Sequence, residues 1–228
     1  MAADHPLDRP VWAALTTRQS GLALGSSRAV RIDPDYGLFA AAADTSPQSL
    51  SALAALVKAE GEAGMVEARD WPAIHGVVAQ PPLAVAQMVA GELKTLPADG
   101  FEIVDLTEQD AAEMFDLARL TQPGPFYSRT HRLGDFVGVK VGGVLAAMAG
   151  ERLKLPGFTE VSAVCTHPGH RGRGYAAALM GVVAGRIEAR GETPFLHVFP
   201  HNTGAIRIYE GLGYRIRCEM KLTILTPG

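Results

Sequence analysis

The chain has 228 residues, 47% of them hydrophobic and 20% charged, with a formal net charge of −3. This length and composition predict a globular protein with a good core, as one large domain or two small ones. No basic run is present, so a nucleic-acid partner is not indicated. Two cysteines, Cys165 and Cys218, give no disulfide framework, which suits a reducing cytosol.

Membrane and targeting signals are weak in this sequence. The N-terminus lacks the basic start and apolar core of a signal peptide. The longest uncharged apolar stretch, residues 174–185, is shorter than the roughly 20 residues that a membrane helix needs. The histidines are scattered without metal-ligand spacing, so no metal is predicted. We expect a soluble cytoplasmic monomer or homodimer with no membrane partner.

The first half of the chain is predicted to mix helices and strands. Ser46-Pro47 is an N-cap with proline at the first helical position, and apolar residues then recur at helical spacing over 47–60. The apolar run 83–90 fits either a strand or a helix. Further elements are expected at 11–17 as a helix, and at 28–32, 37–42 and 65–69 as strands.

Residues 97–100, Pro-Ala-Asp-Gly, are the best domain boundary, dividing a smaller α/β half (1–97) from a second half (98–228). The second half is expected to begin with a strand at 101–106 and a helix to about 120. Gly142-Gly143 then joins the two strands of a hairpin. Further strands are expected from 159, at 195–199 and at 214–225, with helices at 176–190 and 203–210.

The stretch Thr159–Tyr175 combines a β-rich run, a glycine-rich turn and the start of a helix. At a helix N-terminus, unpaired backbone N–H groups and the positive end of the helix dipole point toward the same place. Gly172 and Gly174 lack a Cβ atom, so a bulky anion can approach the main chain, and Arg171 and Arg173 add charge. This arrangement predicts a phosphate-binding turn.

The spacing Arg171-x-x-Gly174-x-Ala176 resembles motif A of the GNAT superfamily of N-acetyltransferases. The element order of the second half also matches the GNAT fold, an α/β (α+β) fold with a mixed central sheet. The region from Arg-Thr-His-Arg-Leu-Gly-Asp-Phe (129–136) to Arg-Gly-Arg-Gly-Tyr (171–175) resembles the FR47-like subset, in which a degenerate GNAT-like half often precedes the active one. The resemblance implies that acetyl-CoA is the co-substrate and that the turn holds its pyrophosphate. The residues implied are Arg171, Gly172, Arg173, Gly174, Tyr175 and Ala176.

Two neighbouring strands splay apart in the GNAT fold, and the resemblance places the thioester between the 159 strand and the 195 strand. Backbone groups of Val164, Cys165 and Thr166 are then expected to pair with the pantetheine arm, and one N–H there to stabilise the oxyanion. Cys165 also allows an acetyl-cysteine intermediate, but a buried thiol is the favoured interpretation because alternation places it opposite Glu160.

Glu160 is the candidate general base. The histone-acetyltransferase branch of GNAT proteins carries a glutamate at this offset before motif A. An alkyl ammonium has a pKa of about 10.4, so it must lose a proton before it attacks. Partial burial is expected to raise the pKa of the Glu160 carboxylate toward that task. The alternative is a glutamate that is solvated or paired with an arginine.

Tyr209 is the candidate general acid, in a stretch from Asn202 to Tyr214 that resembles GNAT motif B. The resemblance implies that its hydroxyl protonates the departing thiolate and that Asn202 contacts pantetheine. The alternatives are core packing for Tyr209 and a helix N-cap for Asn202. Tyr214 is expected to pack in the core.

The acceptor is indicated only by a loop that contains Tyr127, Arg129 and His131. In GNAT enzymes this loop often borders the acceptor site, and the residues would suit an amine that carries a carboxylate. An ordinary polar loop is the alternative. The predicted protein is therefore an acetyl-CoA-dependent N-acetyltransferase that acts on a primary amine of a small molecule or peptide. The competing class is a non-catalytic acyl-CoA-binding module.

Overall fold

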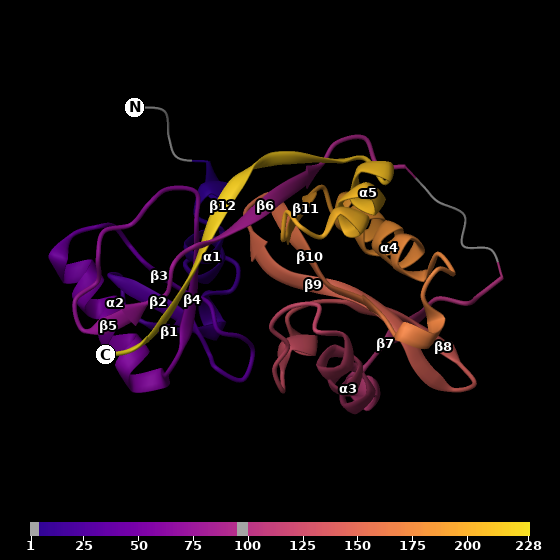
Figure 1. Ribbon diagram of the computed structural model, residues 1–228, viewed down its shortest axis with the longest axis horizontal. Coiled ribbons are helices and arrows are strands. Elements are labelled where there is room, and N and C mark those ends of the chain that lie inside the picture. Colours follow the sequence, from indigo (N-terminus) through magenta and orange to yellow (C-terminus); the bar gives the residue numbers. More distant parts are fainter. Residues whose placement is uncertain (1–4, 95–99) are drawn as a thin grey trace. The chain divides into compact units, whose positions relative to one another are not determined.

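A computed structural model describes residues 5–94 and 100–228 (Figure 1). The chain forms two compact units. The boundary predicted between residues 97 and 98 lies outside the described residues. Unit 1 comprises residues up to Ala86, Leu153–Pro156 and Cys218–Gly228, and unit 2 comprises Gln87–Arg152 and Gly157–Arg217.

Unit 1 contains a three-stranded antiparallel sheet on which helix α2 (Pro47–Glu60) packs. The helix begins where the Ser46 side chain accepts a hydrogen bond from the backbone N–H of Ser49, and it ends at Gly61, which has a φ of 83°. Its bounds match the sequence prediction. The three strands and the short helix beside them are β1 (Ala23–Gly25), β2 (Ala29–Ile32), β3 (Ala40–Ala42) and α1 (Pro10–Leu15).

Two further strands of unit 1, β4 (Ala63–Glu67) and β5 (Val77–Ala79), pair antiparallel with the end of β12 (Tyr214–Pro227). Strand β5 is not predictable from the sequence, because its three residues are too few for a periodic signal. The ambiguous run 83–90 is strand β6 (Leu83–Ala90). Strands β6 and β12 each contribute residues to both units.

Unit 2 is built on a mixed sheet with the strand order β12-β6-β11-β10-β9-β8-β7 (Figure 1). Strands β10 and β11 run parallel, whereas β8 runs antiparallel to β7 and β9, so the predicted mixed sheet is confirmed. Gly142 and Gly143, at φ of 61° and 83°, close the predicted hairpin. The strands are β7 (Val104–Leu106), β8 (Phe136–Val141), β9 (Val144–Leu155), β10 (Phe158–Thr166) and β11 (Thr193–Val198).

Helices α3 (Ala111–Thr121) and α4 (Tyr175–Ala189) cover opposite faces of this sheet, and both contact β10 (Figure 1). Apolar side chains of α3 pack on one face against Phe136, Met148 and Cys165. Helix α4 ends before Gly191, at a φ of 75°, as the sequence predicts. Helix α5 (Thr203–Gly211) precedes β12.

The predicted strand at 101–106 is shorter in the structure, since only Val104–Leu106 pairs with β8.

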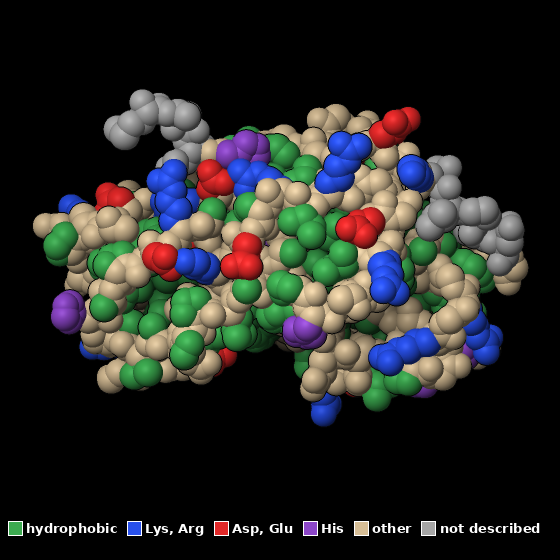
Figure 2. All heavy atoms as spheres, turned by 45° about the horizontal axis from the view of Figure 1, so that its top comes forward, with side chains coloured by type: hydrophobic (Ala, Val, Ile, Leu, Met, Phe, Trp, Pro, Cys, Tyr) green, Lys and Arg blue, Asp and Glu red, His purple; other side chains and the backbone are tan. Residues whose placement is uncertain are grey.

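Among the described residues, no helix is both long and apolar enough to cross a membrane. Nor does any group of three or more His, Cys, Asp or Glu side chains in these residues have an arrangement that could hold a metal ion. On the face drawn in Figure 2, acidic and basic side chains are interspersed.

Candidate active site

The glycine-rich turn leads directly from β10 into α4. A short 3-10 helix, Pro168–His170, follows the strand, and Gly172 and Gly174 then adopt φ of 76° and 79°. Only glycine reaches this left-handed region without strain. Gly174 is the N-cap of α4 and offers no side chain to the first-turn N–H groups, which are therefore available to an anion.

The other predicted cofactor residues lie around this turn. Arg171 and Arg173 are exposed, while Ala176 is half-buried in the first turn of α4. The Tyr175 ring is buried and meets the ring of Phe101 edge-on at 4.7 Å between centroids. The turn thus combines glycines at positive φ, the N-terminus of a fifteen-residue helix and two exposed arginine side chains.

Strands β10 and β11 pair only at their beginnings. The parallel register runs from Phe158 opposite Thr193 to Glu160 opposite Phe195. Yet β10 continues to Thr166 and β11 to Val198. The two strands therefore separate beyond Glu160, in the half of β10 that leads to the phosphate-binding turn. We call this separation the β10/β11 opening.

Strand β10 loses its alternation within this half. Arg152 and Met148 are four residues apart on β9, so their side chains share a face. Met148 packs with Cys165, and Arg152 contacts Glu160, so Glu160 and Cys165 lie on that same face. Ala163, at a φ of 53°, is the irregular residue between them, as in a β-bulge. The prediction that alternation places Cys165 opposite Glu160 is wrong.

A consequence of the irregularity is that Val164 and Thr166 lie on the face opposite Glu160. Both side chains are half-buried, and Cys165 between them is buried. Burial raises the pKa of the Cys165 thiol to about 11, an effect only partly offset by hydrogen bonds from Thr121 and the backbone of Met148. The residue is a packed thiol against α3, and not an activated nucleophile.

Glu160 is fully buried and bound on both oxygens. The Arg152 guanidinium donates from Nε to Oε2 at 2.8 Å and from Nη2 to Oε1 at 2.7 Å. Nδ1 of His197 lies 2.7 Å from Oε1. Burial alone raises the pKa of Glu160, but the charge and hydrogen bonds of Arg152, with the contact from His197, outweigh it and lower the pKa to about 2. The prediction that burial leaves Glu160 with a raised pKa is wrong.

The contacts of Glu160 continue across the sheet. Nε2 of His197 lies 3.1 Å from Nε2 of Gln87, and Oε1 of Gln87 accepts a hydrogen bond from Nη1 of Arg217 at 2.9 Å. We call Arg152, Glu160, His197, Gln87 and Arg217 the polar stripe. It takes one residue from each of the neighbouring strands β9, β10, β11, β6 and β12, in that order.

Four members of the polar stripe, all except Glu160, were not predicted from the sequence. His197 was only one of several scattered histidines. A signal was nevertheless present, because His197 and Gln87 each interrupt a strand whose other residues are almost all apolar. A lone polar residue inside an apolar strand must find a buried partner, and this constraint would have directed attention to both.

Tyr209 lies on α5 and is half-buried. Burial raises its pKa to about 12, so the phenol is protonated at neutral pH and can donate a proton. Its ring centroid lies 6.4 Å from that of Tyr214. Tyr214 is buried in the core, as the sequence predicts, and its hydroxyl has no hydrogen-bond partner within residues 5–94 and 100–228. Asn202 caps α5, since its side chain accepts a hydrogen bond from the N–H of Ala205.

The loop predicted to border the acceptor is held by its own contacts. The His131 ring, whose side chain is only 7% exposed, lies with Nε2 3.0 Å from Glu108. The Thr130 hydroxyl accepts a hydrogen bond from the backbone N–H of Tyr127. The Tyr127 side chain is half-buried and Arg129 is exposed. His131 is thus engaged with Glu108, and an acceptor role for these residues stays a prediction.

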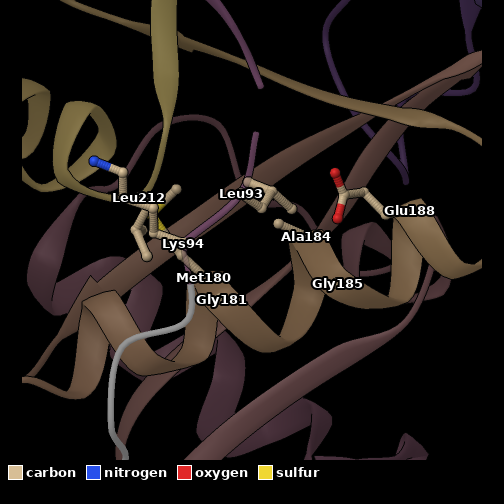
Figure 3. Close-up of a pocket in the computed structure, with 8 residues that line it drawn as sticks. All are labelled: Leu93, Lys94, Met180, Gly181, Ala184, Gly185, Glu188 and Leu212. Carbon is tan, nitrogen blue, oxygen red and sulfur yellow. The ribbon is translucent and has the colours of Figure 1, made fainter. Parts of the chain in front are cut away.

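A separate hollow of about 110 Å³ lies on helix α4 (Figure 3). Its wall is mostly apolar, with Lys94 and Glu188 as the charged side chains, and Leu93 and Leu212 close it opposite the helix. None of the predicted catalytic, cofactor-binding or acceptor-binding residues lines this hollow. The candidate site is therefore the β10/β11 opening with the adjoining turn, and not this hollow.

Comparisons with known proteins agree with this geometry. The family described as FR47-like protein matches residues 136–222. An acetyltransferase of the GNAT family from Novosphingobium aromaticivorans is 44% identical, with a TM-score of 0.90 over 99% of this chain and 100% of that one. A GCN5-related N-acetyltransferase from Kribbella flavida has the same fold, at 22% identity and a TM-score of 0.63 over 95% and 96% of the two chains. Comparison with curated proteins finds no match.

A mixed sheet whose parallel strands separate next to a glycine-rich turn and a helix N-terminus defines the class, an acyltransferase. The overall likeness to the Novosphingobium protein then fixes the family. The chain belongs to the GNAT family of N-acetyltransferases.

Proposed function

We propose that this protein transfers the acetyl group of acetyl-CoA directly to a primary amine of a small molecule or peptide. The observation that carries the proposal is the end of the β10/β11 pairing at Glu160 and Phe195, while both strands continue. Backbone groups of Val164–Thr166 can then pair with the amides of pantetheine as an added strand would. The turn at Gly172 and Gly174 receives the pyrophosphate.

The proposed reaction forms the C–N bond, breaks the C–S bond and moves one proton from the attacking nitrogen to the sulfur, by way of Tyr209. The amine nitrogen attacks the thioester carbonyl carbon, and a backbone N–H near Val164 or Cys165 stabilises the oxyanion. The C–S bond then breaks and the sulfur leaves with the electron pair. Tyr209 gives its phenolic proton to that sulfur, a proton that it holds at neutral pH because its pKa is about 12.

Asn202 and the two cysteines also bear on the proposal. Asn202 is exposed at the start of α5, where its N–H groups and side chain can contact pantetheine in addition to capping the helix. Cys165 and Cys218 are thiols and not a disulfide, which supports the predicted cytoplasmic location, where reducing conditions hold. Monomer or homodimer stays the expected state.

The test is a thiol-release assay with acetyl-CoA and a panel of amines, together with calorimetry of coenzyme A binding. Tyr209→Phe should lower kcat by about 100-fold or more while leaving the Kd for coenzyme A nearly unchanged. An equal loss of turnover and of affinity would reject the acid role. Coenzyme A binding without release of thiol to any amine would instead favour the non-catalytic acyl-CoA-binding module.

A further inference from the structure

We propose that the acceptor is an amine whose ammonium form has a pKa near or below 8, such as the α-amino group of a peptide, and not an alkyl amine of the lysine type. The inference rests on the proposed function and deepens it. It follows from four side chains at or beside the β10/β11 opening, Glu160, His197, Cys165 and Tyr209, each of which is already hydrogen-bonded or holds its own proton. None of these four is in a state to take a proton from an alkyl ammonium.

Glu160 cannot serve as the proton acceptor in this arrangement. Its side chain is fully buried, Oε2 accepts from Arg152, and Oε1 accepts from Arg152 and His197 together. To take a proton, the carboxylate would have to give up a bidentate ion pair in a buried setting, which leaves the guanidinium uncompensated. The geometry makes Glu160 a fixed anion.

His197 is two residues past the last paired position of β11 and lines the opening. Hydrogen bonds to its neighbours set which of its two ring nitrogens carries hydrogen. Arg217 donates to Oε1 of Gln87, so the amide nitrogen of Gln87 must be the atom that faces His197. That nitrogen donates to Nε2, and Nδ1–H consequently donates to Glu160. The only lone pair of the imidazole is thus occupied.

Two further titratable groups, Cys165 and Tyr209, are acids that hold their protons. Burial keeps the Cys165 thiol protonated, against α3, and keeps the Tyr209 phenol protonated on α5. The charged groups that face His197 from neighbouring strands are Glu160 and, behind it, Arg152; Arg217 stands behind Gln87. Phe195 contributes only its ring, 5.7 Å from that of His197.

The consequence for the acceptor is large. At pH 7.4, roughly one in a thousand lysine-type amines is uncharged, whereas about a quarter of peptide α-amino groups are. Without a proton acceptor, an enzyme gains a factor of roughly 300 by using the second class. The reaction still balances: the neutral amine attacks, Tyr209 protonates the departing sulfur, and the surplus proton on nitrogen returns to the Tyr209 phenolate.

The experiment measures kcat/KM against pH for the wild-type protein with three acceptors. These are a peptide with a single α-amino group, an N-acetyl-lysine amide, and an aromatic amine that is uncharged above pH 6. Each profile should rise with unit slope and level off at the pKa of its own acceptor, near 8 for the peptide and near 10.4 for the lysine derivative. The aromatic amine should give a flat profile. Activity with the aromatic amine but not with the peptide would show that the acceptor amine belongs to a small molecule and not to a peptide.

A shared break that does not move with the acceptor would overturn the proposal, since it would belong to a group on the enzyme. Glu160→Gln is the second measurement. In this variant the pH at which each profile levels off should still equal the pKa of the acceptor. A break that appears or disappears would show that Glu160 titrates in turnover.

A peptide with one α-amino group and one lysine offers a further check, because both amines belong to the same molecule and the comparison of the two does not depend on how tightly the peptide binds. The ratio of α- to ε-acetylation, read by mass spectrometry, should fall at least tenfold between pH 7 and pH 10.5.

Failure of the proposed function looks different. If no amine is acetylated at pH 10, where alkyl amines are also largely uncharged, then the acetyltransferase assignment to amines fails as a whole. If alkyl amines react at pH 7 as fast as peptides do, the function stands and only this inference falls.

Discussion

The Glu160–Arg152 pair makes a testable contribution to stability. The pKa of Glu160 falls from an ordinary 4.5 to about 2 in the folded protein. At about 1.4 kcal/mol per unit, this corresponds to about 3 kcal/mol of stability. Because the folded pKa is the lower one, the contribution is fully present above about pH 4.5 and is lost as the pH falls toward 2. Glu160→Gln should therefore unfold at a lower urea concentration at pH 7, with a cost of about 3 to 5 kcal/mol.

Glu108 offers a matched control within the same chain. It also binds an arginine on both oxygens and a histidine on one, through Arg132 and His131, and its pKa is likewise lowered to about 2. Its side chain, however, is 61% exposed, whereas that of Glu160 is fully buried. Water and salt screen the exposed pair, so Glu108→Gln should leave the urea midpoint nearly unchanged.

The assay is urea unfolding followed by circular dichroism at several pH values from 7 to 3, for the wild-type protein and the two variants. The difference between wild type and Glu160→Gln should shrink as the pH falls below 4.5. A difference that stays constant with pH would mean that packing and not charge carries the effect. Equal costs for Glu160→Gln and Glu108→Gln would refute the argument that burial makes the first pair valuable.

Four further substitutions test local claims. Gly174→Ala should weaken coenzyme A binding in calorimetry and cost about 1 to 2 kcal/mol of stability, since its φ is 79°; Gly181→Ala in the middle of α4 should instead stabilise by up to about 1 kcal/mol. Ser46→Ala should lower stability by about 1 kcal/mol through the lost cap of α2, as read from the urea midpoint. Cys165→Ala should retain acetyl transfer, and loss of turnover without loss of folding would revive the acetyl-cysteine intermediate.

Local signals were sufficient for most of the fold. The helix at Pro47–Glu60 has a serine cap, a proline at its first position and a glycine after its last residue, so its bounds were predictable. The hairpin at Gly142-Gly143 was equally clear. The apolar run Leu83–Ala90 was not, because a buried strand and a buried helix segment look alike at this length, and only its neighbours in the sheet decide.

The candidate site was predictable where it depends on the backbone. Glycines at positive φ and a helix start fix the turn, and the sequence shows both. The ionisation of Glu160 was not predictable, since its partners Arg152 and His197 lie 8 and 37 residues away along the chain. Nor could alternation reveal the irregular residue Ala163, because alanine carries no preference for a left-handed φ.

The polar stripe also answers a structural problem that the opening creates. Beyond Glu160 and Phe195, strands β10 and β11 no longer hold each other by backbone hydrogen bonds. The contact of Glu160 with His197 bridges the two strands where the ladder stops, and Arg152 and Gln87 extend it to β9 and β6. Side-chain hydrogen bonds thus connect the two strands where backbone pairing has ended. The backbone groups of β10 nearer the turn then remain available to bind a ligand. A glutamate fixed in this way serves the geometry of the opening, and that accounts for its burial and its low pKa better than proton transfer does.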